Sequence, residues 1–132
     1  MFPLQSPKQN QILAALPAED YARLLPYLES TFMSLGQVIY EPGASISHLY
    51  FPTTSIFAPV YGVENGTSVR LAIIGNEGLT GISALLGGGS MPGGVVVQSA
   101  GNAYRIKTNI LKKEFDSRGK FQRLVLHYTQ AL

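Results

Sequence analysis

The sequence predicts a single α+β domain built around a small antiparallel β-roll or barrel. Apolar residues recur at helical spacing through the first 30 of its 132 residues and again from residue 108 onward. Between these helical parts, short apolar runs recur about every ten residues and end in turn-forming residues, as in barrels and sandwiches. The order of helices, strands and helices is typical of an α+β domain, and the chain length fits one domain.

The N-terminal part, residues 1–30, is predicted to form helices. Ser6, Pro7 and Gln9 fit a capping box with proline at the first helical position. Pro17 starts a second helix. Pro26 should end or bend that helix, because proline lacks an N–H and its ring clashes with the preceding turn.

The middle part, residues 31–107, contains the predicted strands. Asn65 and Gly66 fit a tight hairpin turn, since both residues tolerate positive φ angles. Residues 79–86 are expected to form a short helix between strands, and residues 87–94 a glycine-rich loop. The apolar runs that we expect to form strands are 32–35, 38–40, 49–51, 56–61, 69–74, 95–98 and 103–106.

The C-terminal part, residues 108–132, is predicted to form two helices. Thr108 caps the first one, and a stripe of apolar residues lies on one side of the second. No cap or proline closes the stripe, so we expect the helix to continue beyond this chain. The stripe suits core packing and a coiled-coil dimer face equally well. Its residues are Phe121, Leu124, Val125, Tyr128 and Leu132.

Composition excludes several classes of function. The chain has no cysteine, which removes disulfides, thiol catalysis and cysteine-ligated metals. His48 and His127 are far apart in the sequence, so no metal ligand set is expected. The serines and threonines have no paired base, so no catalytic residue is expected, and no cofactor is expected either. A net charge of +2 is too weak to indicate nucleic-acid binding. Only 14% of residues are charged, against about 25% in an average domain, which suggests that a partner covers part of the surface.

The cellular location is predicted from the lack of a signal peptide and of a membrane-spanning segment in the sequence. The N-terminus lacks a charged leader followed by an apolar core, and no apolar run is long enough to span a membrane. We therefore expect a cytoplasmic protein that has no membrane partner.

Several motifs, taken in order, resemble the cyclic-nucleotide-binding domain, and more narrowly the sensor domain of Crp–Fnr transcription regulators. They are the segments 36–43, 46–51, 64–74, 75–84 and 95–100. The resemblance implies a β-roll of the jelly-roll type over residues 31–107, flanked by N-terminal helices. It also implies a ligand cassette with a short helix at 79–86, then a hinge helix at 108–116 and the start of a dimerisation helix.

This chain departs from the family at the cassette. The family carries a glutamate that reaches the ribose and an arginine that pairs with the cyclic phosphate. Here Gly81 stands at the matching glutamate position, and no arginine occurs between residues 71 and 104. Standard binding of cAMP or cGMP is therefore not expected. Arg70 is either a replacement for the lost arginine or a surface residue paired with Glu64 or Glu77. The ligand-pocket candidates are Arg70, Gly81, Ile82, Ser83, Ala84, Ser90, Gly94 and Val95.

The function implied by the resemblance is that of a ligand-sensing, homodimeric regulator domain, not an enzyme. Its ligand is an unidentified small molecule, and DNA would be contacted only by a C-terminal helix-turn-helix domain that these 132 residues do not contain. One alternative is a regulatory module attached to an enzyme or transporter. A cupin-like enzyme is a further alternative, which the scattered histidines argue against.

Overall fold

The N-terminal helices are shorter than the sequence predicts. The computed structural model describes residues 5–62, 68–70, 73–88, 90–91 and 93–130, with the backbone alone for residues 61–62 and 68–70. The capping box of Ser6 and Gln9 is present, but it closes a single 3-10 turn, η1 (Pro7–Gln9). Helix α1 (Gln11–Ala14) follows, and then α2 (Ala18–Leu24) and the 3-10 turn η2 (Leu25–Tyr27). Pro26 ends α2 as expected.

Asn10 divides the predicted first helix because its side chain starts α1. The side-chain oxygen accepts hydrogen bonds from the amides of Ile12 and Leu13, at 3.0 and 3.4 Å. The side-chain nitrogen donates to the carbonyl oxygens of Pro52 and Gly78, at 2.9 and 2.8 Å. Asn10 is fully buried, and all its polar groups are therefore satisfied inside the protein.

The strands form two antiparallel sheets, which confirms the predicted α+β roll. The first sheet has the order β1 (Glu29–Met33), β7 (Gly101–Lys107), β3 (His48–Pro52). The second has the order β2 (Val38–Tyr40), β6 (Gly94–Ser99), β4 (Ile56–Gly62), β5 (Ser68–Arg70). β4 and β5 pair up to Gly62 and Ser68, but the Asn65–Gly66 turn between them lies outside the described residues.

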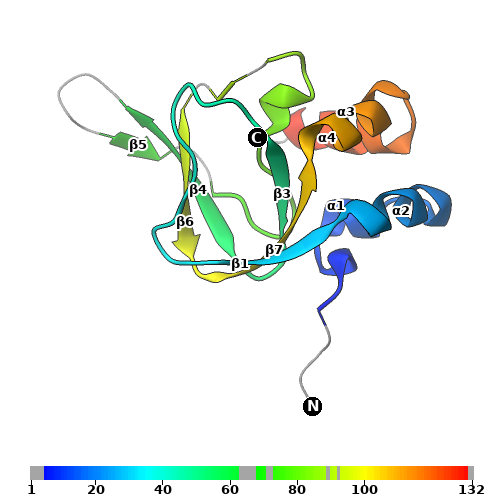
Figure 1. The fold of residues 1–132 in the computed structure, drawn as a ribbon, viewed down its shortest axis with the longest axis horizontal. Coiled ribbons are helices and arrows are strands. Elements are labelled where there is room, and N and C mark those ends of the chain that lie inside the picture. The colour runs from blue at the N-terminus through cyan, green and yellow to red at the C-terminus, as the bar shows by residue number, and fades with distance from the viewer. Residues whose placement is uncertain (1–4, 63–67, 71–72, 89, 92, 131–132) are drawn as a thin grey trace.

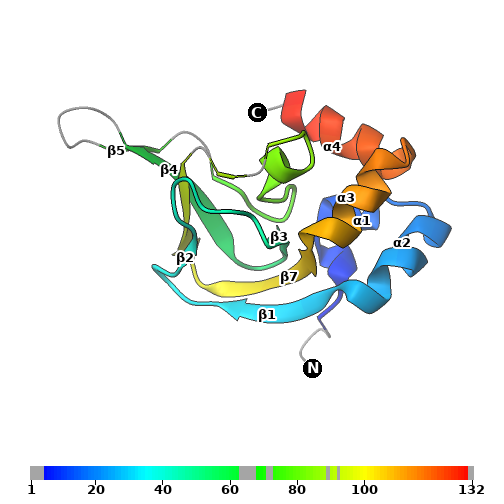
Figure 2. The ribbon, with the colours of Figure 1, turned by 45° about the horizontal axis from the view of Figure 1, so that its top comes forward.

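Both C-terminal helices form, and they lie with α1 and α2 at one end of the roll. β7 runs directly into α3 (Thr108–Asp116), and α4 (Lys120–Gln130) follows (Figures 1 and 2). Side chains alternate across a strand, so β3 and β7 present one face to the helices and the other to the second sheet. The first strand already begins at Glu29, two residues before the predicted start of the roll.

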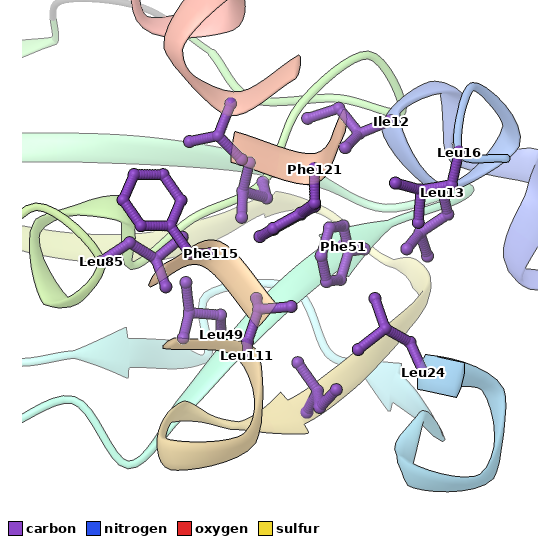
Figure 3. Close-up of a cluster of buried hydrophobic side chains, with 13 residues drawn as sticks. Ile12, Leu13, Leu16, Leu24, Leu49, Phe51, Leu85, Leu111, Phe115 and Phe121 are labelled. Carbon is purple, nitrogen blue, oxygen red and sulfur yellow. The ribbon is translucent and has the colours of Figure 1, made fainter. Parts of the chain in front are cut away.

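Two buried clusters hold these layers together. The first joins the helices to the sheet, with Phe51 of β3, Phe115 of α3 and Phe121 of α4 near its centre (Figure 3). The rings of Phe115 and Phe121 meet edge to face, with centroids 6.4 Å apart. The second cluster fills the space between the sheets and includes Met33 and Phe57, both of them fully buried.

Candidate ligand-binding site

The predicted cassette helix at residues 79–86 is wrong in extent. Only Ile82–Ala84 is helical, as one 3-10 turn, η4. Thr80 forms a bridge with Tyr50 of β3, in which each amide donates to the other residue's carbonyl, at 3.0 and 3.3 Å. Gly81 then has a φ of 98°, outside the right-handed helical region. A helix therefore cannot begin before residue 82.

Tyr40 occupies the space beside Gly81. A Cβ at position 81 would lie 2.7 Å from the Tyr40 hydroxyl, which is too close for a real side chain, and 3.0 Å from Cγ of Leu49, which is a very tight contact. The buried hydroxyl donates a hydrogen bond to the carbonyl oxygen of His48. Burial, with nearby Tyr50, raises the pKa of Tyr40 far above its usual value, so the phenol stays neutral.

An aromatic series continues from Tyr40 into the roll. Tyr50 meets Tyr40 edge to face with ring centroids 6.1 Å apart, and it meets Phe57 in the same way at 6.4 Å. Met91 packs against the same cluster. The sequence does not predict these residues as part of the site, because only the tertiary packing brings Tyr40 next to position 81.

The glycine-rich segment lies against both the cassette turn and the turn after β2. The hydroxyl of Ser83 donates to the Ser90 carbonyl at 3.3 Å. Ser90 also bridges to Ser45. Met91 exchanges backbone hydrogen bonds with the turn, since its amide donates to the Ala44 carbonyl at 3.0 Å and its carbonyl accepts from the Gly43 amide at 2.8 Å.

The candidate pocket residues therefore fall into three groups. Residues 81–84 and Ser90 are brought together, with Ile82 and Ser83 half-buried and Ser90 exposed. Gly94 and Val95 are buried at the start of β6, and Gly94 lies beside the Tyr40 backbone. The backbone of Arg70 pairs with Val60 in β5, but its side chain lies outside what the structure describes. Its proposed contact with a ligand stays a prediction.

Comparison with known proteins identifies the architecture. No protein-family model and no curated protein matches the sequence. A solved structure of the N-terminal domain of a Streptomyces coelicolor transcriptional regulator matches 95% of this chain over 87% of its own length, with 18% identity and a TM-score of 0.70. The catabolite activator protein of Thermus thermophilus matches 91% of the chain with 19% identity and a TM-score of 0.67. This chain covers 55% of that protein, about half its length.

Two further matches point to the same architecture. A cyclic nucleotide-binding-like protein of Brucella abortus matches 80% of this chain over 96% of its own length, with 19% identity and a TM-score of 0.65. The regulatory domain of a Toxoplasma gondii protein kinase A, solved with cAMP, matches 83% of this chain over 46% of its own length, with 13% identity and a TM-score of 0.69. The chain has the fold of a cyclic-nucleotide-binding domain.

Within this cyclic-nucleotide-binding fold, the stripe predicted on the last helix contributes to the domain's own core. Phe121 and Val125 are fully buried against the sheet and α3. Leu124 and Tyr128 are half-buried at the edge of the same cluster, and Leu132 lies outside the described residues. Core packing thus accounts for the two innermost residues. A dimer contact through the accessible ones stays a prediction.

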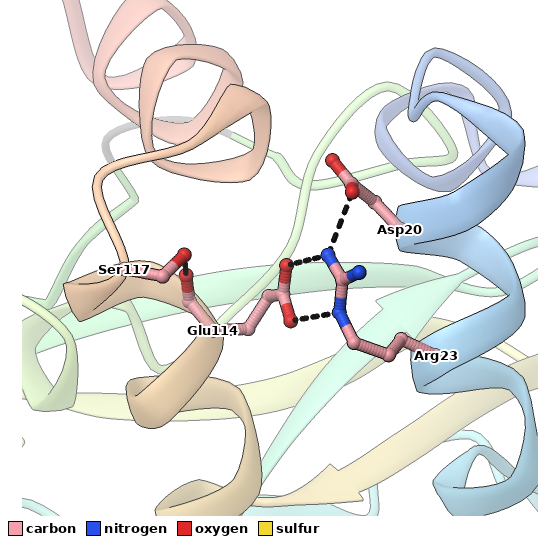
Figure 4. A network of polar contacts seen from close by, with 4 residues as sticks. All are labelled: Asp20, Arg23, Glu114 and Ser117. Carbon is pink, nitrogen blue, oxygen red and sulfur yellow. Dashed lines mark hydrogen bonds and ion pairs between the residues drawn. The ribbon is translucent and has the colours of Figure 1, made fainter.

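An ion-pair network joins the N-terminal helices of the cyclic-nucleotide-binding fold to α3. The guanidinium of Arg23 in α2 donates to both carboxylate oxygens of Glu114, at 3.2 and 2.9 Å (Figure 4). It also donates to Asp20 at 2.6 Å. Beside this network a half-open cleft of about 600 Å³ lies between the two helices, with Tyr27 and Ile110 among its lining residues.

Two further observations concern the described part of the chain. There, histidines and carboxylates nowhere gather in groups of three or more that could hold a metal ion. None of the described helices combines the length and the apolar character needed to cross a membrane.

Proposed function

We propose that this domain senses a small-molecule ligand as the sensor and dimerisation domain of a cytoplasmic, bacterial Crp–Fnr-like transcription regulator. The observation that carries the proposal is the direct connection of β7 to α3. Leu111 and Phe115 of α3 pack in the same buried cluster as Phe51 of β3. A ligand that moves the roll relative to α3 would therefore have to repack this cluster, so that the state of the roll would be passed to the helices.

The proposed ligand is not cAMP or cGMP. A cyclic phosphate in a largely apolar roll needs paired charges, and hydrogen bonds to charged groups contribute about 1.5–3 kcal/mol each. Loss of both the arginine and the ribose-binding glutamate should weaken binding by roughly two to four powers of ten. Isothermal titration of the domain tests this directly. Micromolar binding of either nucleotide would contradict the proposal, and loss of that binding in Arg70→Ala would identify the group responsible.

Dimerisation is proposed through the accessible side of α4. Phe121 and Val125 cannot serve a second copy without opening the core, so the contact would use Leu124, Tyr128 and the exposed Leu126. Sedimentation velocity on the full-length gene product should show dimers, and Leu126→Glu should weaken them. A full-length monomer at high concentration would contradict this part of the proposal.

Control of transcription is tested by the coding sequence that follows codon 132. A helix-turn-helix there, together with specific DNA binding by the full-length product, would support the proposal. The alternative is a regulatory module attached to an enzyme or transporter, and the match to a kinase regulatory domain favours keeping it. A catalytic or membrane segment after codon 132 would support that alternative instead.

A further inference from the structure

A cluster of basic side chains lies on one face of the first sheet, at the end where β7 leads into α3. His48 of β3 is directly opposite Lys107 of β7, and Arg105 lies two residues earlier in β7 on the same face. Glu29 of β1 lies opposite Arg105. Among the described residues, it is the only acidic residue that forms an ion pair with this cluster. Three basic side chains thus face one acidic side chain.

The ion pairs within the cluster are long. Oε1 of Glu29 lies 3.4 Å from Nε of Arg105 and 4.0 Å from Nε2 of His48. A charge-assisted hydrogen bond would be about 2.7–2.9 Å. Glu29 is also 54% exposed, so its carboxylate is free to turn toward solvent.

Arg105 carries an unsatisfied buried donor. Its Nε atom is buried and has no hydrogen-bond partner, and among the described residues this is the single buried side-chain atom in that state. A buried donor without an acceptor is costly, so native proteins satisfy nearly all of them. Glu29 is the nearest carboxylate, at 3.4 Å, and it does not satisfy this donor, although the Arg105 side chain as a whole is 39% exposed.

The N-terminus of α3 adds positive potential at the same place. The helix begins one residue after Lys107, which is its N-cap residue and makes no side-chain cap. Its first turn contains no acidic residue. The Thr108 amide donates to the carbonyl of Ser47, and the Ser47 hydroxyl lies 3.0 Å from Nδ1 of His48, so the helix start and the cluster are adjacent. The positive end of a helix dipole favours an anion there.

We propose that Arg105, His48 and Lys107 bind a phosphate group at the start of α3. The fork of the Arg105 guanidinium would donate to the phosphate oxygens, and the anion would displace Glu29 toward solvent. A dianionic phosphate, free or as a monoester, matches the charge of the cluster better than the single charge of a cyclic phosphodiester. The proposal deepens the proposed function by naming a ligand class, and it depends on that function only for the link to regulation.

Protonation of His48 should be coupled to phosphate binding. Burial lowers the pKa of His48, Arg105 and Lys107 lower it further, and Glu29 opposes them. A bound dianion reverses this balance, because it favours the charged imidazole. Phosphate should therefore raise the pKa of His48 relative to its value in the free domain.

NMR titration of the domain with inorganic phosphate, AMP and cAMP tests the proposal. We expect phosphate and AMP to shift the His48 ring signals and raise its pKa, and cAMP to bind at least roughly tenfold more weakly than AMP. Binding of inorganic phosphate but not AMP would identify free phosphate as the ligand. Unchanged His48 signals with both phosphate and AMP would overturn the proposal, whether or not the full-length protein regulates transcription.

Variants separate an anion site from a purely structural cluster. Arg105→Gln, and separately the exposed Lys107→Gln, should weaken phosphate binding by roughly tenfold or more, while Arg123→Gln on the outside of α4 should leave it unchanged. Glu29→Gln should strengthen binding severalfold, because it removes the competing carboxylate. Equal binding by the Lys107 variant and the wild type, or weaker binding by the Glu29 variant, would overturn the proposal.

Discussion

Substitution of Gly81 by alanine tests whether Tyr40 fills the space beside position 81. The φ of 98° should cost an alanine about 1–2 kcal/mol of strain. Its Cβ would also lie 2.7 Å from the Tyr40 hydroxyl, and such overpacking costs about 1–3 kcal/mol. We therefore expect Gly81→Ala to lower the free energy of unfolding by about 2–5 kcal/mol. A chain of this length should then melt roughly 3–5 °C lower per kcal/mol.

Gly87→Ala is the matched control for backbone strain. Gly87 has a similar φ of 100°, but a Cβ there would meet nothing within 4 Å. Urea unfolding of both variants should give a difference of about 1–3 kcal/mol, which measures the steric clash alone. Equal losses in the two variants would show that Tyr40 does not occupy this space.

A double-mutant cycle with Tyr40→Phe identifies the clashing atom. The single change removes the hydrogen bond to the His48 carbonyl and should cost about 1 kcal/mol. In the Tyr40→Phe background, Gly81→Ala should cost at least about 1 kcal/mol less than in the wild type, since the nearest atom is gone. Strict additivity of the two changes would refute this packing and would place the clash at Leu49 instead.

Three further predictions concern stability. Asn10→Ala should lower the free energy of unfolding by about 2–5 kcal/mol in urea, because it removes a helix cap and leaves two buried carbonyls unpaired, whereas Ser6→Ala should cost at most about 1 kcal/mol. Phe121→Ala should cost about 3–5 kcal/mol even in a monomer, and a stability loss only under dimer-forming conditions would contradict its place in the core. Burial raises the pKa of Tyr128 to about 12 from 10.0, with Glu77 adding to the rise. The unfolded chain therefore loses this proton first, so stability should fall between about pH 10 and 12, and Tyr128→Phe should flatten that part of the curve.

The roll could be predicted from the sequence because its signals are local. Alternating apolar residues and turn residues mark each strand, and the ordered motifs identify how the strands connect. The prediction of a helix over residues 79–86 was wrong. Gly81 argues against such a helix, because glycine adopts positive φ angles as readily as negative ones, and Gly81 has a positive φ here. The last helix shows the limit of periodicity, which indicates a buried face but not the partner that buries it. Phe121 turned out to be covered by Phe115 of the same chain.

The parts of the site that the sequence did not predict depend on contacts between distant segments. Tyr40 reaches position 81 only because β2 and the cassette turn meet across the roll. Arg105 and His48 share a face only through the register of β3 and β7, which is a tertiary property. A single asparagine at position 10 looks like an ordinary helix cap until the fold brings Pro52 and Gly78 to its nitrogen.

That asparagine has a consequence for how the domain moves. The side-chain amide of Asn10 forms hydrogen bonds with the start of α1, with Pro52 at the end of β3 and with Gly78, three residues before Gly81. The 2.8 Å hydrogen bond from the Asn10 side chain to the Gly78 carbonyl links the segment before Gly81 directly to the start of α1. A displacement of that segment should therefore also displace α1. Hydrogen exchange should accordingly show α1 and the 78–81 segment opening together as one cooperative unit. Removal of the first ten residues, which include Asn10, should loosen the 78–81 segment.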